Sequence, residues 1–404
     1  MIQVLEGKTV VLCITGGIAA YKAADLTSRL RKLGAKVHII MTESATHFIP
    51  PLTLEVLSEN RVVTDMFDRT FTWEVEHISL AKCADVFVVA PATANIIGKA
   101  AHGIADDMVS TTLMATKAPL VIAPAMNTNM YQNPVVQENM AQLKKRGVHF
   151  VEPESGRLAC GDTGTGKLAD PAVIAEAIVQ AAVPQDLAGR SLLITAGPTR
   201  EALDPVRFIS NHSTGKMGYA IARHASRRGA RVTLVSGPVA LEVPRGVALV
   251  PVTCAQEMRD AVMTRLDEQD WVIKAAAVGD YRPVTQAQDK IKKKADDLSV
   301  ALVKNPDILK EIGAHKRENQ LVCGFSMETQ DLIANSKAKL ESKNCDLLVA
   351  NNLKTEGAGF AHDTNVATIL YRDGHIEALS LMEKEQLADI LLNRMLELDR
   401  QKKG

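Results

Sequence analysis

Two adjacent glycines form the first candidate binding turn of the chain. Gly16 and Gly17 follow the apolar run at residues 9–15 and lead directly into a helix-compatible stretch. Backbone N–H groups at the positive end of a helix suit a phosphate. The turn lacks the G-x-G-x-x-G pattern of dinucleotide sites, and a tight turn without a ligand explains it equally well. The turn alone therefore leaves phosphate binding open.

Two further turns come directly after predicted buried strands. Residues 90–95 read A-P-A-T-A-N, and residues 123–131 read A-P-A-M-N-T-N-M-Y. Open α/β folds bind ligands at the carboxyl ends of their strands, where these turns would meet. Ser44, Asn95 and Asp107 could hydrogen-bond a ligand there, although a helix cap fits each of them individually.

The second half of the chain contains a similar set of turns. Residues 196–201 (A-G-P-T-R-E), 204–211 (D-P-V-R-F-I-S-N) and 213–218 (S-T-G-K-M-G) join a strand end to a helix start and again offer backbone donors to a phosphate. Lysines follow at positions 290, 292, 293 and 294. A lysine run is usually a solvated face. In a long loop opposite a nucleotide-binding turn, it can neutralise a triphosphate.

One segment imitates a phosphate-binding loop. Residues 161–167 read G-D-T-G-T-G-K, but Leu168 replaces the Ser or Thr that would hold a metal, and no strand precedes them. We interpret the segment as part of a long loop, residues 152–170, that covers the first site. Residues 196–214 and 276–305 are two more long loops rich in Gly, Pro and polar side chains, and such loops are often functional.

The elements that must position these turns follow one pattern twice. Hydrophobic residues make up 46% of the chain and aromatics only 4%, which favours sheets of aliphatic strands covered by helices. We predict an α/β protein of two doubly wound, Rossmann-like three-layer domains, residues 1–189 and 190–404. The first domain has predicted strands at 9–15, 36–41, 86–90 and 120–123 and helices at 18–33 and 171–182. The second has predicted strands at 191–195, 231–235, 248–252, 271–275, 321–325 and 347–350 and helices at 218–228, 331–343 and 384–398. Segments 368–372 and 375–379 flank Asp373-Gly374, which indicates a two-residue antiparallel hairpin near the end of the second domain.

Charge and composition exclude several classes of protein. Lys plus Arg and Asp plus Glu each number 47, so no overall field attracts nucleic acid or an anionic membrane. No apolar run approaches the ~20 residues that span a bilayer, and no basic region of a signal peptide begins the sequence. The six cysteines form neither a C-x-x-C pair nor a zinc-like spacing with histidine. We therefore expect a cytosolic protein without a structural zinc or a disulfide framework.

Several segments together resemble a known enzyme family. Residues 16–22 (G-G-I-A-A-Y-K), the isolated His77, the A-P-x-M-N-x-x-M motif at 123–130 and residues 158–161 (L-A-C-G) look like the homo-oligomeric flavin-containing cysteine decarboxylases. The second half extends the similarity to the bifunctional phosphopantothenoylcysteine decarboxylase/phosphopantothenate:cysteine ligase family of coenzyme A biosynthesis, over nearly the whole chain. Tyr131 stands where the family motif usually has Trp, and Thr214 where Ser is more frequent.

The resemblance implies a flavodoxin-like, FMN-dependent decarboxylase in residues 1–189. Loss of CO2 from an N-acyl cysteine leaves a carbanion without an electron sink, so a flavin must first oxidise the thiol. By resemblance, His77 assists oxidation and decarboxylation, Asn127 holds the substrate carboxylate and Cys160 donates the proton. From the residues alone, a structural histidine, a helix cap and an inert thiol are the simpler interpretations. The implied FMN-binding residues are Gly16, Gly17, Ile18, Ala19, Ser44, Ala94, Asn95 and Asp107.

The resemblance implies a CTP-dependent ligase in residues 190–404. It would activate the carboxylate of 4'-phosphopantothenate as an acyl cytidylate, which L-cysteine then attacks. Asn211 would stabilise the acyl cytidylate step and Lys290 would contact the phosphates. Mg2+ would accompany the triphosphate, with Asp280 as a candidate ligand and a turn cap as the alternative interpretation of that residue. The implied CTP-binding residues are Lys274, Ala275, Ala276, Asp280, Lys290, Pro306, Asp307, Ile308, Leu309, Phe325, Lys339 and Lys343.

The family also implies a homo-oligomer, a dodecamer of decarboxylase trimers with dimeric ligase domains. Two other functions compete with this interpretation. A nicotinamide-dependent dehydrogenase would also use two α/β domains, but G-x-G-x-x-G is missing at both strand ends. A flavoprotein-like regulatory binding subunit would need neither His77, Asn127 and Cys160 nor the ligase loops.

Overall fold

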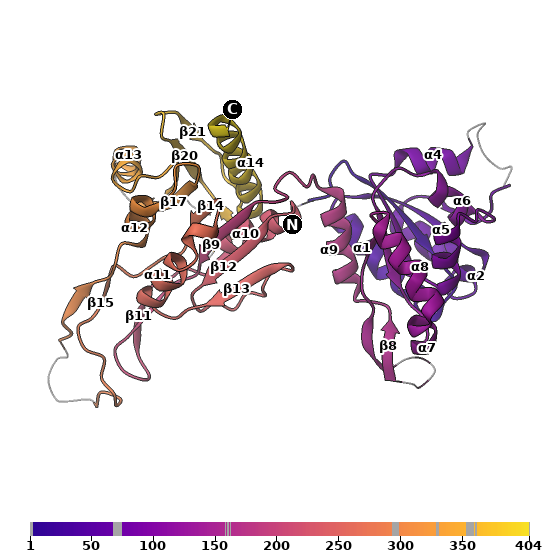
Figure 1. Ribbon diagram of the computed structural model, residues 1–404, viewed down its shortest axis with the longest axis horizontal. Coiled ribbons are helices and arrows are strands. Elements are labelled where there is room, and N and C mark those ends of the chain that lie inside the picture. Colours follow the sequence, from indigo (N-terminus) through magenta and orange to yellow (C-terminus); the bar gives the residue numbers. More distant parts are fainter. Residues whose placement is uncertain are drawn as a thin grey trace. The chain divides into compact units, whose positions relative to one another are not determined.

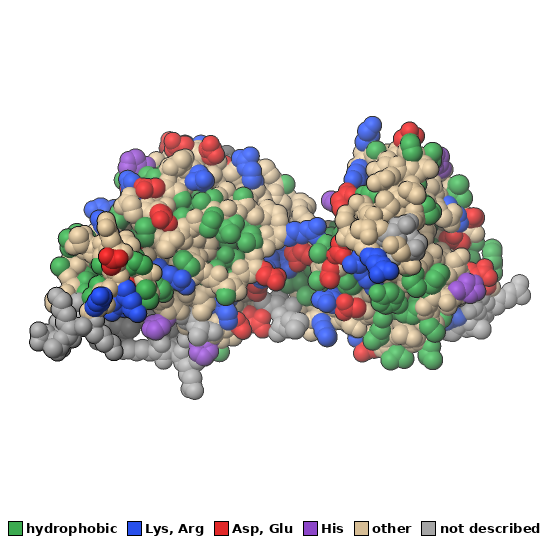
Figure 2. Space-filling model, turned by 90° about the horizontal axis from the view of Figure 1, so that it is seen from below, with side chains coloured by type: hydrophobic (Ala, Val, Ile, Leu, Met, Phe, Trp, Pro, Cys, Tyr) green, Lys and Arg blue, Asp and Glu red, His purple; other side chains and the backbone are tan. Residues whose placement is uncertain are grey.

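The computed structural model describes residues 3–67, 75–157, 159, 161, 163–292, 299–328, 331–352, 359 and 362–403. The chain divides into two units, Met1–Pro184 and Gln185–Gly404, each with its own sheet and helices (Figure 1). Among the described residues, no helix is both long and apolar enough to cross a membrane. Lys and Arg side chains are interspersed with Asp and Glu over the face seen in Figure 2, as expected from the balanced charge.

Unit 1 contains a six-stranded sheet in which all neighbouring strands are parallel, in the order β3-β2-β1-β4-β5-β6. Without the two-residue β3, the other five strands have the flavodoxin-like order. The strands are β1 (Thr9–Ile14), β2 (Lys36–Met41), β3 (Val62–Val63), β4 (Val86–Ala92), β5 (Leu120–Pro124) and β6 (His149–Phe150). A separate antiparallel hairpin consists of β7 (Glu154–Arg157) and β8 (Thr163–Lys167).

Helices cover both faces of this sheet. They are η1 (Ile18–Lys22), α1 (Ala23–Lys32), α2 (Glu43–Thr46), α3 (Pro51–Ser58), α4 (Glu76–Cys83), α5 (Ala94–His102), α6 (Met108–Ala115), α7 (Thr128–Gln132), α8 (Pro134–Lys145) and α9 (Pro171–Ala182). Successive side chains of a strand point to opposite faces. Accordingly, Val10 and Leu12 of β1 join the buried cluster of α1, α3 and α9, whereas Val11 and Cys13 join that of α4, α5, α6 and α8. The three-layer prediction is therefore confirmed for unit 1.

Unit 2 contains an eight-stranded sheet in the order β13-β12-β9-β14-β17-β18-β20-β21. The first six strands are parallel and have the Rossmann order 3-2-1-4-5-6 when numbered along the chain. The last two are antiparallel. The strands are β9 (Ser191–Ala196), β12 (Arg231–Ser236), β13 (Val247–Pro251), β14 (Trp271–Lys274), β17 (Leu321–Glu328), β18 (Leu347–Asn352), β20 (Ala367–Tyr371) and β21 (Ile376–Ala378).

The helices of unit 2 again form two layers. They are α10 (Lys216–Arg227), α11 (Ala255–Met263), η2 (Leu266–Glu268), α12 (Ile308–His315), α13 (Leu332–Ser342) and α14 (Lys384–Lys403). α10 and α14 share a buried cluster with Leu192 and Ile194 of β9. α11, α12 and α13 share another with Leu193. The second Rossmann-like domain is therefore also confirmed.

Two predictions about irregular segments need correction. The three long loops contain short antiparallel strands: β7 and β8 in the first, β10 (Arg200–Ala202) and β11 (Phe208–Ser210) in the second, and β15 (Tyr281–Pro283) and β16 (Leu302–Lys304) in the third. A further small pair consists of β19 (Thr364–Asn365) and β22 (Met382–Glu383). The predicted two-residue hairpin has a three-residue turn at 372–374, because the N–H of Tyr371 donates to the carbonyl of His375 (3.0 Å) and Gly374 adopts φ +93°.

Candidate functional sites

The first candidate site lies where the strand order of unit 1 reverses, between β1 and β4. The turns after β1, β4 and β5 surround a cavity of 480 Å³, together with residues from the β7–β8 hairpin and the segment that follows it. This is the usual ligand position of an open α/β sheet. The lining residues are Gly16, Gly17, Ile18, Ala19, Tyr21, Lys22, Thr93, Ala94, Ala125, Met126, Asn127, Met130, Arg157, Ala159, Gly166, Lys167 and Leu168.

Close backbone packing explains the glycines of the first turn. A Cβ atom on Gly16 would lie 2.3 Å from Cβ of Ser44, so only glycine fits there. Gly17 has an extended backbone and, as glycine, has no side chain that could cap the helix η1 that follows. The first N–H groups of η1 are therefore left for a ligand. The Thr15 hydroxyl donates to the carbonyl of Pro91 (2.7 Å) and accepts the N–H of Thr93 (3.0 Å). This side chain therefore fixes the first turn against the second.

The β7–β8 hairpin holds the third turn in place. The N–H of Met126 donates to the carbonyl of Gly166 (2.9 Å). A Cβ on Gly166 would lie 2.2 Å from the Met126 carbonyl oxygen, and one on Gly164 would lie 2.5 Å from Oγ1 of Thr128. The glycines of the G-T-G-K sequence thus allow β8 to pack closely against the turn that follows β5. The segment is a strand and not a phosphate-binding loop before a helix.

The structure brings only part of the predicted FMN and decarboxylase set to this cavity. Gly16, Gly17, Ile18, Ala19, Ala94 and Asn127 line it. Ser44 packs against Gly16, whereas His77 lies in α4 and is not a lining residue. Asn95 is exposed on α5 beside Ala94. Cys160 lies outside the described residues.

Asp107 has a structural role in this unit. Its side chain caps α6 by accepting the N–H of Ser110 (2.8 Å), and it accepts from Lys99 (2.8 Å). Burial opposes ionisation, but these hydrogen bonds hold the pKa of Asp107 below its ordinary value. The helix-cap interpretation considered from the sequence therefore accounts for this residue.

Tyr131, which replaces the usual Trp, is not a lining residue either. Its ring packs against the buried cluster of α5 and α8, and its hydroxyl donates to Glu152 (2.8 Å). Lys144 donates to the same carboxylate (2.7 Å). Because the N–H of Tyr131 donates to the carbonyl of Asn127 (2.9 Å), this network fixes the far end of the turn that carries Asn127.

The second candidate site lies where the strand order of unit 2 reverses, between β9 and β14. A cavity of 270 Å³ opens there beside the N-terminus of α10. A Cβ on Gly218 would lie 2.6 Å from Cβ of Ala196, so glycine lets the first turn of α10 pack directly on β9. The lining residues are Asn211, Ser213, Thr214, Gly215, Lys216, Met217, Gly218, Lys274, Ala275, Ala276, Ala277, Val278, Asp280, Phe325, Met327, Lys339, Asn351, Gly359, Asn365 and Lys384.

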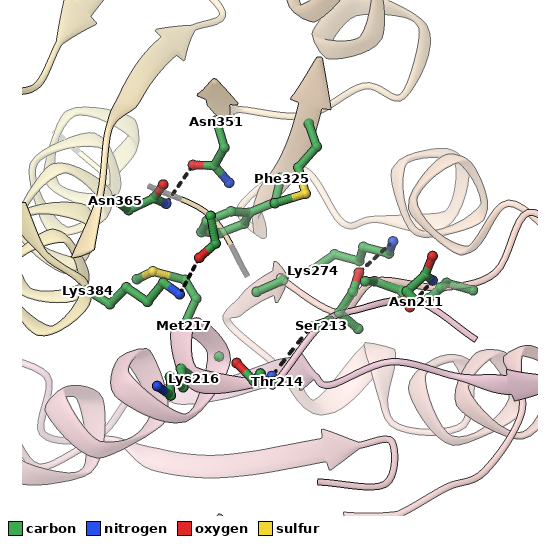
Figure 3. Close-up of a pocket in the computed structure, with 18 of the residues that line it drawn as sticks. Asn211, Ser213, Thr214, Lys216, Met217, Lys274, Phe325, Asn351, Asn365 and Lys384 are labelled. Carbon is green, nitrogen blue, oxygen red and sulfur yellow. Dashed lines mark hydrogen bonds between the residues drawn. The ribbon is translucent and has the colours of Figure 1, made fainter. Parts of the chain in front are cut away.

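Four lysines and one carboxylate, that of Asp280, are among these lining residues. Figure 3 shows Lys216, Lys274 and Lys384 reaching the cavity from α10, β14 and α14. Burial and the charge of Lys339 lower the pKa of Lys274 to about 8. Burial and the charge of Lys216 lower the pKa of Lys384 to about 8. Crowded, partly desolvated cations beside a helix N-terminus make this site suitable for a polyanion.

The ends of β18, β19 and α14 supply cavity residues that the sequence analysis missed. Asn365 of β19 donates to the side-chain oxygen of Asn351 at the end of β18 (2.8 Å), as Figure 3 shows. Lys384 donates to the carbonyls of Gly359 (2.9 Å) and His362 (2.6 Å). Lys216 belongs to the S-T-G-K-M-G segment at 213–218, which the sequence analysis had singled out. No sequence pattern near residues 351, 365 or 384 indicates a binding role.

The predicted CTP and ligase set is also divided. Asn211, Lys274, Ala275, Ala276, Asp280, Phe325 and Lys339 line the cavity. Pro306, Asp307, Ile308, Leu309 and Lys343 do not: Ile308 and Leu309 are buried in the core, and Asp307 caps α12 and pairs with Lys343. Lys290 is exposed on the arm between β15 and β16. The described residues contain no group of three or more His, Cys, Asp or Glu side chains that could hold a metal.

Comparison with known proteins first defines the class. Residues 3–183 match a family model described as Flavoprotein, and residues 187–398 match that of the DNA/pantothenate metabolism flavoprotein C-terminal domain. The chain is 49% identical over 401 residues to the coenzyme A biosynthesis bifunctional protein CoaBC of Bacillus subtilis, covering 98% of both chains. It is 45% identical over 396 residues to that of Escherichia coli K12, covering 97% of both.

A crystal structure of the C-terminal domain of a CoaBC protein is 40% identical, with a TM-score of 0.46, and covers 53% of this chain and 97% of that chain. The full-length similarities show the family: the chain belongs to the bifunctional coenzyme A biosynthesis proteins CoaBC. It is an enzyme with the decarboxylase and ligase steps of that family. Neither the regulatory subunit nor the dehydrogenase is favoured.

Proposed function

We propose that unit 2 is the CTP-dependent phosphopantothenate:cysteine ligase and unit 1 the FMN-dependent phosphopantothenoylcysteine decarboxylase. The observation that carries the assignment is the contrast between the two cavities at equivalent places of two doubly wound sheets. The cavity of unit 2 is lined by four lysines at a helix N-terminus, whereas that of unit 1 combines Ile, Ala and Met side chains beside a glycine turn with three cations at its edge, Lys22, Arg157 and Lys167. The first suits a triphosphate and the second a flat aromatic cofactor.

Ligation requires activation, because a carboxylate is a poor electrophile at neutral pH. In the proposed reaction, an oxygen of the 4'-phosphopantothenate carboxylate attacks the α-phosphorus of CTP and pyrophosphate leaves. The amine of L-cysteine then attacks the acyl carbon, loses a proton and releases CMP. Lys216, Lys274, Lys339 and Lys384 would neutralise the phosphates, and Asn211 would orient the acyl cytidylate through its amide.

Asn211 is well placed for such a role. Its amide nitrogen donates to the carbonyl of Ala277 (2.8 Å), which fixes the side chain beside the turn that follows β14. Mg2+ would be bound mainly by triphosphate oxygens and water, as is usual at nucleotide sites. Asp280 would be the protein ligand of such an ion.

The residues of unit 1 fit FMN. A cavity of 480 Å³ lies within the usual range of cofactor pockets, and the Gly16-Gly17 turn offers backbone N–H groups for its phosphate. When bound, FMN would take a hydride from the substrate thiol side and return it to the product. Asn127 would hold the substrate carboxylate until CO2 leaves, His77 would assist, and Cys160 would donate the proton that replaces CO2.

Arg157 and Lys167 of the hairpin also line this cavity. Both cations would attract an anionic substrate such as phosphopantothenoylcysteine.

The proposal further includes a cytosolic location and a homo-oligomer, a dodecamer built from decarboxylase trimers and ligase dimers. Phosphopantothenoylcysteine, the product of unit 2, would be the substrate of unit 1.

The test supplies the purified protein with 4'-phosphopantothenate, L-cysteine, Mg2+ and CTP and follows products by mass spectrometry. We expect 4'-phosphopantetheine, CO2, CMP and pyrophosphate. Replacing CTP by ATP tests the nucleotide, and giving phosphopantothenoylcysteine directly tests unit 1 without the ligase. Accumulation of phosphopantothenoylcysteine by flavin-loaded protein would remove the decarboxylase assignment. Normal turnover of Lys290→Gln or Cys160→Ser would remove the role of that residue.

A further inference from the structure

A buried carboxylate outside the ligase cavity joins two segments that are distant in the sequence. The side chain of Asp204 is 0% exposed. One oxygen, Oδ1, accepts the N–H groups of Val206 and Arg207, both at 2.8 Å. The other, Oδ2, accepts Nε of Arg207 (3.0 Å) and the N–H of Ile291 (3.0 Å). All four donors therefore converge on a single side chain.

Ile291 belongs to the arm between β15 and β16, 87 residues after Asp204. Two more bonds join the same segments. Nη2 of Arg207 donates to the carbonyl of Ile291 (2.5 Å), and the N–H of Ala287 donates to the carbonyl of Leu203 (3.0 Å). The backbone on both sides of Lys290 is therefore anchored, although the Lys290 side chain itself is exposed.

The anchor is strongly charged. Burial opposes ionisation of Asp204, but the N–H groups of Val206, Ile291 and Arg207, with the Arg207 guanidinium, hold its pKa well below the usual range. A neutral acid or amide at this place would lose the acceptor that Arg207 and Ile291 share. The same turn leads through β11 directly to Asn211 of the cavity.

We propose that Asp204 is a positioning residue of the ligase: by fixing Ile291 and Arg207 it sets the place of Lys290, and so the affinity for the triphosphate of CTP. The inference rests on the proposed function of unit 2. Asp204 does not line the cavity, so it would act on the nucleotide indirectly, through the position of Lys290. Its loss therefore weakens CTP binding more than it slows turnover of bound CTP.

Asp204→Asn tests this with almost no change of shape. Oδ1 can still accept from Val206 and Arg207, while the new amide nitrogen faces two donors, Nε of Arg207 and the N–H of Ile291. We expect the KM for CTP to rise about tenfold, with a smaller change in kcat. Decarboxylation of added phosphopantothenoylcysteine by the same preparation should be unchanged.

A matched control separates positioning from general damage. Asp346 is another buried aspartate of unit 2; it accepts the N–H of Val322 and the amines of Lys316 and Lys402, all at 2.8 Å. Asp346→Asn should lower the stability of unit 2 and leave the KM for CTP unchanged. An equal rise of the KM in both variants would overturn the proposal.

A double-mutant cycle supplies the second readout. If Asp204 acts through Lys290, Asp204→Asn should add almost nothing to the KM for CTP in a Lys290→Gln background. A full additional tenfold rise there would overturn the proposal. If Asp204→Asn does not fold, Ile291→Pro removes one donor and keeps the carboxylate; an unchanged KM for CTP in that variant would also overturn it. Absence of CTP-dependent product from the unmodified protein would instead contradict the proposed function.

Discussion

Replacement of Gly218 by Ala should damage the ligase by moving one helix. The new Cβ would lie 2.6 Å from Cβ of Ala196 and 2.9 Å from the carbonyl oxygen of Thr195. Neither atom is the end of a flexible side chain, so α10 must move away from β9. Overpacking of this kind costs about 1–3 kcal/mol, whereas Ala gains about 1 kcal/mol over Gly in a helix.

The expected net result is a loss of up to about 2 kcal/mol in the free energy of unfolding of unit 2. Because the first turn of α10 lines the cavity, the KM for CTP should rise as well. Urea titration can measure the first effect in a Trp73→Phe background. Trp271, fully buried in β14, is then the only tryptophan and reports unit 2 alone.

Gly98→Ala is the matched control. Gly98 lies inside α5 of unit 1, and a Cβ there would meet only Nδ2 of Asn139, at 3.8 Å. The helix gain then remains, so this variant should stabilise unit 1 by about 1 kcal/mol without altering CTP binding. If Gly218→Ala left the free energy of unfolding of unit 2 unchanged or raised it, and CTP bound normally, close packing of α10 on β9 would not explain the glycine.

Three further outcomes follow from contacts in the two units. Tyr131→Phe removes the donor to Glu152, so the KM of decarboxylation should rise up to about tenfold, while ligation stays normal. Tyr131→Trp keeps an N–H donor and should restore most of the lost affinity. Equal KM values in all three proteins would contradict a role of this hydrogen bond in holding the Asn127 turn. The KM for CTP should rise from about pH 7 to about pH 9, because the pKa values of Lys274 and Lys384 are about 8 and neutral amines attract phosphate less; a flat profile would argue against their contact with the nucleotide. Burial lowers the pKa of His224, but hydrogen bonds to two carboxylates of α14 outweigh burial and raise the pKa. The protonated His224 should therefore stabilise unit 2 fully below about pH 6.5, and this stabilisation should be lost as the pH rises through the raised pKa. Urea titrations at several pH values should show that His224→Gln lacks this pH dependence of stability; an unchanged pH dependence would refute the prediction.

The sequence predicted the sheets well because buried parallel strands are short aliphatic runs bounded by glycine. Thr9–Ile14 shows this pattern plainly, with Gly7 before it and Gly16 after it. It could not predict β8, since T-G-T-G-K lacks apolar alternation and the strand forms through backbone pairing with β7 and contacts to the Asn127 turn.

The sequence placed residues at the cavities best where they follow a strand end. The turn after β14 carries Ala275, Ala276 and Asp280 into the cavity, as the position of the strand required. Lys384 was missed, because only the antiparallel return of the chain brings the start of α14 to the opposite side of the same cavity. Long-range placement of this kind leaves no local pattern.

The antiparallel direction of β20 gives unit 2 a place for chemical labelling. Tyr371 pairs with Leu347, so the turn at 372–374 lies at the amino end of β18, whereas Asn351, which lines the cavity, lies toward its carboxyl end. Asp373 is exposed in that turn. A fluorophore attached at Asp373→Cys, or a short peptide inserted there with Gly374 retained, would therefore report on unit 2 without entering its cavity.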